Sequence, residues 1–279
     1  MTEIVDRQGN IAPDAGAQAE MPQGRKIPRW WVTVGALVFF VIVWEIFGRQ
    51  INPVFGSYPT AIAAAFWEIA LNGKLLDALL DSLRPFVFGY ALSIIIGVPL
   101  GLVIGRFWIV ESALGILVTA GYAMPLVALV PLLILWLGLG FAVKVAVIFL
   151  MGIFPILINT WLGVRAVPKT LIEVGRSFVA SDAVILRRIV LPATLPYIMA
   201  GIKLAVGRAV VGMVIAEFFT SISGLGAIII NSANNFDTAT MFVPILVLMV
   251  LAIGLNDLIG WIEHKVAPWQ AEIAGRNRE

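Results

Sequence analysis

The chain has 279 residues, of which 60% are hydrophobic and only 13% are charged, with a formal net charge of +2. Soluble domains carry about 25% charged residues. A chain this apolar cannot cover itself with polar surface, so we expect an integral membrane protein. The small net charge and scattered basic residues argue against nucleic-acid binding, and the absence of cysteine excludes disulfides and thiolate metal sites.

Taken in chain order, the sequence begins with a polar stretch, residues 1–28, which we expect to be a disordered cytoplasmic tail and not a signal peptide. A membrane helix needs about 20 mostly apolar residues. Six segments meet this requirement, and the third is overlong and broken: 30–48, 82–105, 109–138, 142–164, 195–219 and 240–262. Residues 59–72 are typical of a short amphipathic surface helix. The sequence therefore predicts an all-α polytopic membrane protein with about six spans, a membrane domain at 29–268 and a second tail at 269–279.

Basic residues indicate the orientation, because cytoplasmic loops are enriched in Lys and Arg. With the N-terminus inside, thirteen basic residues fall on the cytoplasmic side: Arg7, Arg25, Lys26, Arg29, Arg106, Arg165, Lys169, Arg176, Arg187, Arg188, Lys265, Arg276 and Arg278. Four fall on the opposite side: Arg49, Lys74, Arg84 and Lys144. We therefore expect a multi-pass membrane protein with both termini in the cytoplasm.

Glycine and proline modify two of the predicted spans. Gly97, Gly101 and Gly105 recur every four residues in the second span, and small residues at this spacing let two helices approach closely in lipid. Pro125 and Pro131 interrupt the third span, and each removes a backbone hydrogen bond. The third span is either a broken helix beside a transport pathway or a kinked, shortened span.

Ionisable residues within predicted spans are expensive and by default suggest function. The fifth span carries Lys203, Arg208 and Glu217, and the sixth carries Asn256 and Asp257. Our hypothesis is that Lys203 pairs with Asp257 at similar depth and that Arg208 faces the interior of the bundle. Alternatively, Lys203 extends to the cytoplasmic headgroups and Arg208 has a structural partner.

No catalytic or metal-binding pattern emerges. The single histidine, His264, stands beside charged neighbours after the last span, and no cluster of metal-ligating residues accompanies it. A phosphate-binding GxxxxGK[ST] loop and a GxSxG nucleophile elbow are both absent from the sequence. We therefore expect no cofactor in this chain.

The loop at about 166–192 interrupts the apolar sequence with charged and proline residues. Its first half follows Pro168 and places Leu171, Val174 and Phe178 at helical spacing. Its second half opens on Ser181, a good N-cap, and closes at Leu191-Pro192 before the fifth span. The pattern predicts two short amphipathic helices on the cytoplasmic side, which lie on anionic lipid or fit a groove on a soluble partner.

This loop resembles the EAA loop of permease subunits of bacterial ABC importers, whose pattern is E-A-A-x-x-x-G-x(9)-I-x-L-P. Glu173, Ile189, Leu191 and Pro192 stand at the required spacing, while Val174 and Gly175 replace the alanines and Val179 replaces the central glycine. A β-branched residue resists the turn that the glycine allows. Either the turn has an ordinary backbone conformation or the partner's groove differs.

The resemblance extends over roughly residues 28–269 and is closest to the sulfonate, taurine and nitrate branch. Segments similar to that branch include VWEIFGRQ, SYPTAIAAAFWEI, DSLRPFVFGYALSIIIGVPLGLVIGR, PLLILWLGLG, LPATLPYIMAGIKLAVGRAVVGMVIAEF and SISGLGAIIINSA. It implies the type I importer permease fold and a translocation pathway for a small, anionic solute. It also implies two copies of the permease, two cytoplasmic ATPase subunits that bind ATP and Mg, and a periplasmic binding protein.

In such permeases the loop forms the coupling helix that inserts into the ATPase, which implies a role for these residues: Leu171, Glu173, Val174, Gly175, Arg176, Phe178, Val179, Ala180, Ser181, Ile189, Leu191 and Pro192. Glu173 would bond to the ATPase cleft. Two other classes stay open: an ion-coupled secondary transporter using Glu217 and Asp257, and a membrane-embedded enzyme. Against the first, hydropathy shows no obvious inverted repeat; against the second, no catalytic constellation of side chains emerges.

Overall fold

The computed structural model describes residues 28–220 and 223–268. Apart from Pro28, the two predicted tails lie outside these residues. Every regular element in the described ranges is helical: α1 Arg29–Gly48, α2 Pro59–Leu71, α3 Lys74–Arg106, α4 Trp108–Ala123, η1 Leu126–Leu129, α5 Val130–Leu137, α6 Phe141–Arg165, α7 Lys169–Ser177, α8 Asp182–Ile185, η2 Leu186–Val190, α9 Leu191–Thr220, α10 Leu225–Asn234 and α11 Thr238–Val266.

The predicted number of spans is confirmed. Five helices in the described part of the chain are long and apolar enough to cross a membrane, and a bent pair, α4 with η1–α5, makes a sixth. The bend is 89° and falls at Met124 and Pro125, where the backbone leaves the helix. Pro131 lies in the first turn of α5, where a missing N–H costs no helical hydrogen bond. The third span is therefore broken at Pro125 and not at Pro131.

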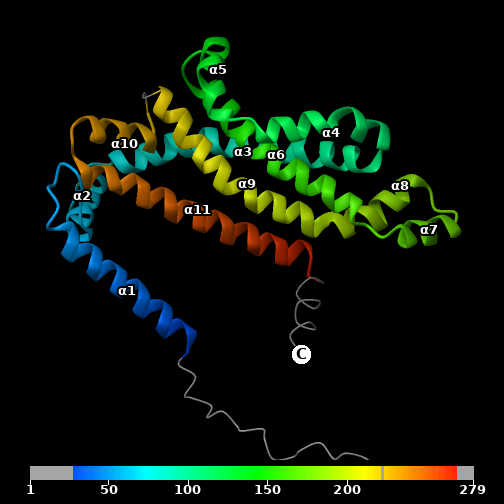
Figure 1. The fold of residues 1–279 in the computed structure, drawn as a ribbon, viewed down its shortest axis with the longest axis horizontal. Coiled ribbons are helices and arrows are strands. Elements are labelled where there is room, and N and C mark those ends of the chain that lie inside the picture. Colours follow the sequence, from blue (N-terminus) through cyan, green and yellow to red (C-terminus); the bar gives the residue numbers. More distant parts are fainter. Residues whose placement is uncertain (1–27, 221–222, 269–279) are drawn as a thin grey trace, which may run out of the picture.

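The centre of the bundle consists of α3, α6 and α9 (Figure 1). Glycines allow α3 to approach α6 closely: a Cβ added to Gly101 would lie 2.7 Å from the Leu157 carbonyl oxygen, and one on Gly105 would lie 2.6 Å from the Val164 Cβ. Gly97 faces Ile156 on the same side of α3. All three glycines thus lie at the α3–α6 contact.

Short helices lie at both ends of the long axis of the molecule (Figure 1). The pair α2 and α10 lies at one end, and α7 and α8 lie at the other. Helix α1 packs against α2 and leaves most of its apolar side chains exposed, with 6% of its apolar window buried.

One boundary differs from the prediction. The second loop helix does not close at Leu191-Pro192, because α8, η2 and α9 form one continuous helix from Asp182 to Thr220. A proline removes an N–H and its ring crowds the carbonyl four residues earlier. The chain accommodates Pro192 with a π-helical turn, Leu186–Val190, directly before it, in which the Leu191 N–H donates to the Leu186 carbonyl.

Candidate functional site

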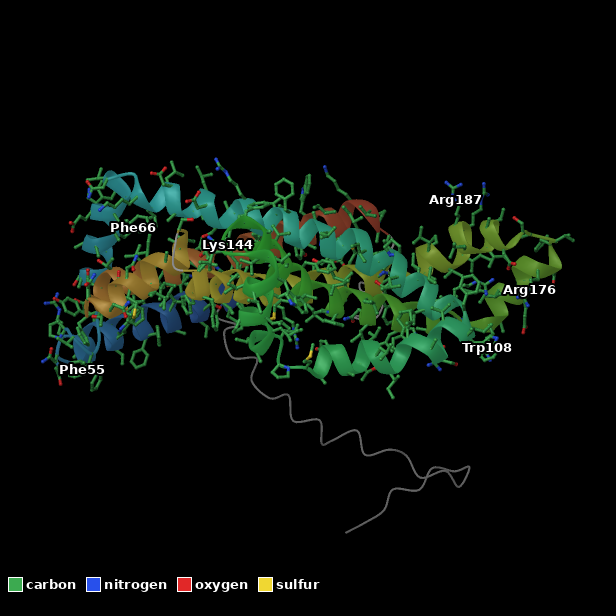
Figure 2. The ribbon with its side chains drawn as sticks, turned by 90° about the horizontal axis from the view of Figure 1, so that it is seen from above. Phe55, Phe66, Trp108, Lys144, Arg176 and Arg187 are labelled. Carbon is green, nitrogen blue, oxygen red and sulfur yellow. The ribbon has the colours of Figure 1, made fainter. Side chains whose placement is uncertain are left out.

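The loop 166–192 projects from the ends of α6 and α9 (Figure 1). Figure 2 shows Arg176 and Arg187 at this end of the molecule, far from Phe55 and Phe66 at the other. Two ion pairs lie at its base: Arg106 with Asp182 at 2.8 Å and Arg165 with Glu111 at 2.5 Å. They connect the loop and α6 to the neighbouring ends of α3 and α4.

Helix α7 has two apolar sides with different environments. The inner side packs through Ile172 and Gly175 on Ile185 and Ile189. A Cβ on Gly175 would lie 2.9 Å from the Ile189 Cδ1, so the glycine lets α7 lie close to the continuous helix.

The outer side of α7 is apolar and exposed. Leu171, Val174 and Phe178 are 46%, 53% and 82% exposed. Glu173 and Arg176 are exposed beside them. Burying apolar surface is favourable by about 25 cal/mol per Å², so this side of α7 is suited to contact with another surface.

The turn after α7 has the conformation usually reserved for glycine. Val179 has φ of +53°, in the left-handed region. The Ala180 N–H donates to the Gly175 carbonyl and the Val179 N–H donates to the Arg176 carbonyl, which together make a Schellman motif. The first alternative from the sequence, an ordinary backbone conformation, is therefore wrong: valine occupies the glycine geometry.

The remaining predicted loop residues complete this unit. Ala180 packs into the loop core with Ile172, and Ile189 lies half-buried in that core. Ser181 occupies the N-cap position of α8 without a side-chain capping bond. Leu191 is exposed and Pro192 half-buried at the start of α9.

The hypothesis that Lys203 pairs with Asp257 is wrong. The Lys203 ammonium pairs with the Glu263 carboxylate instead. Side chains of a helix lean toward its N-terminus, and α9 begins at the loop end of the molecule. Lys203 therefore reaches toward that end, where α11 presents Glu263, more than a turn beyond Asp257. Asn256 and Asp257 are exposed on α11.

Arg208 contacts an aromatic ring. Its guanidinium carbon lies 4.5 Å from the centre of the Tyr122 ring, and its Nη2 donates to the Tyr122 hydroxyl at 3.0 Å. Both contacts connect α9 to α4, and the Arg208 side chain is exposed in the single chain.

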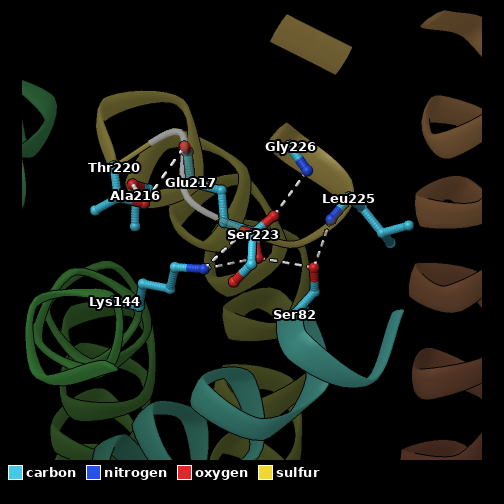
Figure 3. Close-up of polar contacts among 8 residues, drawn as sticks. All are labelled: Ser82, Lys144, Ala216, Glu217, Thr220, Ser223, Leu225 and Gly226. Carbon is cyan, nitrogen blue, oxygen red and sulfur yellow. Dashed lines mark hydrogen bonds and ion pairs between the residues drawn. The ribbon is translucent and has the colours of Figure 1, made fainter. Parts of the chain in front are cut away.

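Glu217 is enclosed by protein groups (Figure 3). Its carboxylate accepts from the Ser82 hydroxyl at 2.7 Å and from the Gly226 N–H at 2.8 Å, and lies 3.6 Å from the Lys144 ammonium. The Lys144 ammonium also donates to the Ser223 carbonyl at 2.8 Å. Lys144, counted among the basic residues of the non-cytoplasmic side, is thus a buried residue of α6.

The same carboxylate stabilises the start of α10. Gly226 lies in the first turn of this helix, where free N–H groups attract a negative charge. The Ser82 hydroxyl accepts a second N–H of this turn, from Leu225, at 2.9 Å. Gly224 has φ of +105°, and a Cβ there would collide with the Glu217 carboxylate. The network therefore connects α3, α6 and α9 to the start of α10.

The described residues contain no group of three or more His, Asp or Glu side chains arranged to hold a metal ion. Within those ranges, the charged side chains form ion pairs, hydrogen bonds and contacts with aromatic rings, namely Arg208 with Tyr122, Arg49 with Tyr58 and Lys265 with Trp261.

Comparison with known families decides what kind of protein this is. The family model described as "Binding-protein-dependent transport system inner membrane component" matches residues 97–268, from the middle of α3 to the end of α11. The chain belongs to this family.

Relatives of this transport component cover nearly its full length. RibX of Chloroflexus aurantiacus, a riboflavin transport system permease protein, is 32% identical over 257 residues, covering 90% of this chain and 96% of the relative. A putative aliphatic sulfonates transport permease protein, SsuC of Bacillus subtilis, is 29% identical over 266 residues, covering 94% and 96%. ThiX of Halalkalibacterium halodurans, a formylaminopyrimidine transport permease protein, is 31% identical over 236 residues, covering 84% and 93%.

A solved structure has the same fold. An inward-facing MetNI methionine ABC transporter matches with a TM-score of 0.51 at 17% identity, covering 71% of this chain and 97% of that chain. The expected importer permease fold is thereby confirmed. The chain is a permease subunit of an ABC importer and not an enzyme, and ATP hydrolysis belongs to a separate subunit.

Several contacting residues of this permease were not among the sequence candidates: Ser82, Tyr122, Lys144, Asp182, Ser223, Gly224, Gly226 and Glu263. A signal existed for Lys144, which stands in the first turn of a strongly apolar helix, and for the glycines, which follow Glu217 closely. Ser82 and Tyr122 carried none, because they are 135 and 86 residues from their partners.

Proposed function

We propose that this permease forms the translocation pathway of an ATP-driven importer for a small anionic solute, similar to a sulfonate, taurine or nitrate. A periplasmic binding protein delivers the solute, and two cytoplasmic ATPase subunits, which bind ATP and Mg, drive the cycle through the loop 166–192. A second copy of this chain completes the membrane part.

The observation that carries the coupling role is the exposed apolar side of α7. The inner side of α7 packs against Ile185 and Ile189 of the same chain. The outer side, with Leu171, Val174 and Phe178, is exposed at one end of the molecule. An amphipathic helix with an exposed apolar side fits a groove on a partner. The basic residues near this end favour a cytoplasmic location, and therefore cytoplasmic termini.

The proposed substrate class rests on the permease branch and on charge. The relatives carry names as different as riboflavin, formylaminopyrimidine and aliphatic sulfonates. The pathway candidates remain Lys203, Arg208, Asn256, Asp257, Pro125 and Pro131. Of these, Arg208 presents an exposed positive charge on α9, which suits an anion.

Neither alternative class gains support from a specific observation. An ion-coupled transporter would need acids that exchange an ion with water, but Glu217 is fully buried and occupied by Ser82, Gly226 and Lys144. Glu217 is for the same reason the weakest of the predicted pathway residues.

Phe178→Asp tests the coupling role. A charge on the exposed side of α7 should weaken ATPase binding by at least about tenfold, as for a central interface residue. The measurement is the amount of cognate ATPase that co-purifies with the permease, together with ATP-driven uptake. Phe55→Asp is the matched control, because Phe55 is also 82% exposed but lies at the other end. Equal ATPase retention by both variants would contradict the proposal.

A further inference from the structure

Four basic side chains lie along the membrane helices α6 and α9, and they differ in how their charge is balanced. Lys144 meets Glu217, Arg165 meets Glu111 and Lys203 meets Glu263. Arg208 meets no carboxylate within ion-pair distance among residues 28–220 and 223–268, and the side chain that it contacts there, Tyr122, is neutral. The bundle thus compensates three of these four charges and leaves the charge of Arg208 without a countercharge.

The position of Arg208 makes this costly. It lies 17 residues from the start of α9 at Leu191 and 12 residues from its end at Thr220, or about 25 Å and 18 Å along the helix axis. A charged side chain at the centre of a membrane helix is expensive and faces a cavity, a partner or a pathway.

The backbones of Arg208 and Tyr122 both lie next to closely packed residues. Val206, Ala209 and Val210, which flank Arg208 on α9, are buried in the core. On α4, Gly121 precedes Tyr122 and lies so close to α6 that a Cβ would be 2.6 Å from the Phe154 ring. The guanidinium is therefore positioned in advance, which lowers the entropy cost of binding a ligand.

The space beside Arg208 is open in the single chain. A Cβ on Gly207 would meet no atom within 4 Å, and Leu204 and Val211 are 60% and 54% exposed on the same side of α9. In the part of the chain that the structure describes, the Arg208 guanidinium donates one hydrogen bond, to the Tyr122 hydroxyl. Since a guanidinium has five N–H donors in a planar fork, donors remain for a ligand in this space.

We propose that Arg208, seated on the Tyr122 ring, binds the anionic group of the solute during its passage, with a carboxylate or sulfonate oxygen pair as the fitting chemistry. The inference rests on the proposed import function and adds to it that the membrane subunit itself selects for negative charge. A planar guanidinium pairs with two oxygens at once, and a single such residue binds weakly enough for the solute to leave.

Another source of negative charge is Asp257 of a second copy. The Lys203–Glu263 pair gives α9 and α11 a common level. Arg208 follows Lys203 by five residues, about 8 Å along α9, and Asp257 precedes Glu263 by six residues, about 9 Å in the same direction because α11 is antiparallel. The two charges therefore lie at similar depth, and both are exposed in the single chain. The open space at Gly207, beside Arg208, favours the solute.

The test uses the complete transporter in proteoliposomes: the permease, its cognate ATPase and the cognate binding protein. The probes are methanesulfonate, isethionate, nitrate and benzoate, and the measured quantity is solute imported per ATP hydrolysed. We expect Arg208→Gln to lower this ratio at least about tenfold while the binding protein still stimulates ATP hydrolysis. Arg208→Lys should fall between, because a lysine lacks the planar fork. Arg84→Gln, which removes an exposed charge elsewhere on a membrane helix, is the matched control.

Three outcomes would overturn the inference. Unchanged import per ATP in Arg208→Gln would remove the anion site and leave the proposed function standing. Restoration of import by the exchanged pair Arg208→Asp with Asp257→Arg would assign Arg208 to an ion pair between copies. Wild-type transporter whose binding protein stimulates ATP hydrolysis but which imports none of the four anions would overturn both the site and the anionic substrate class.

Discussion

Val179 is a β-branched residue in the left-handed turn that ends α7. A β-branched side chain in the left-handed region costs on the order of 1–2 kcal/mol, and Val179 receives no packing in return, since it is 91% exposed. The Schellman hydrogen bonds to Gly175 and Arg176 hold it there. A strained, exposed apolar residue at the tip of the loop is consistent with a role in contacting a partner.

Val179→Gly should relieve this strain. The relief of backbone strain should exceed the entropy cost of a glycine, which has more freedom in the unfolded chain. We therefore expect the free energy of local unfolding at this turn to rise by about 1 kcal/mol. That corresponds to roughly fivefold slower hydrogen exchange at the amides of residues 178–181, and ATPase coupling should stay intact or improve.

Phe236→Gly provides the comparison. Phe236 has φ of +57° at the end of α10 and is 66% exposed, at the opposite end of the molecule. It should show the same slower exchange around its own turn with no effect on coupling. Faster exchange at residues 178–181 in Val179→Gly would mean that the valine is not strained.

At the scale of elements, the Glu217 network lets one carboxylate serve three helices. It balances the charge of Lys144 on α6, accepts from Ser82 on α3 and occupies the N-terminus of α10. A buried ion pair is stable only when further hydrogen bonds satisfy its oxygens and protons, and Gly226 and Ser223 supply them here. The short helix α10, which has few turns of its own, thereby acquires a fixed position on the bundle.

Glu217→Gln should be strongly destabilising, because it leaves the Lys144 ammonium buried at 5% exposure without a countercharge. We expect a loss of about 3–5 kcal/mol in the free energy of unfolding, measured by denaturant titration of the purified protein in detergent. Adding Lys144→Met should recover a substantial part of the loss, since no lone charge then remains.

The control is Glu45→Gln, which breaks the pair with the exposed Arg49 at the end of α1 but keeps a side-chain oxygen that accepts from the Thr60 N–H. Exposed pairs contribute little, so its effect should be much smaller. Additive effects of Glu217→Gln and Lys144→Met would show that the two groups do not interact energetically.

The sequence predicted correctly those elements whose structure follows from the pattern of neighbouring residues. Hydropathy located the spans, the prolines at 125 and 131 indicated a broken third span, and the alternation of α7 indicated an amphipathic helix. The errors concern side-chain partners. Lys203 selects Glu263 over Asp257 because of side-chain direction and helix register, and Lys144 is buried because α9 presents Glu217 to it. Neither fact follows from a single helix.

On the scale of the whole molecule, the two ends of the bundle carry different elements. One end carries α7 and α8 with the exposed basic residues Arg176 and Arg187, and the other carries α2 and α10, with Phe55 nearby (Figure 2). The proposed orientation therefore places the loop 166–192 and the end with α10 in opposite compartments.

Single cysteines test this orientation directly, because the natural chain has none. Val179→Cys and Phe55→Cys introduce thiols at side chains that are 91% and 82% exposed at opposite ends. With a membrane-impermeant maleimide, we expect Phe55→Cys to be labelled in intact spheroplasts and Val179→Cys only in inverted vesicles. Purified ATPase added to stripped inverted vesicles should slow labelling at Val179→Cys, since a docked partner covers the tip of the loop. Labelling of Val179→Cys in intact spheroplasts would reverse the orientation and remove the loop from the ATPase side of the membrane.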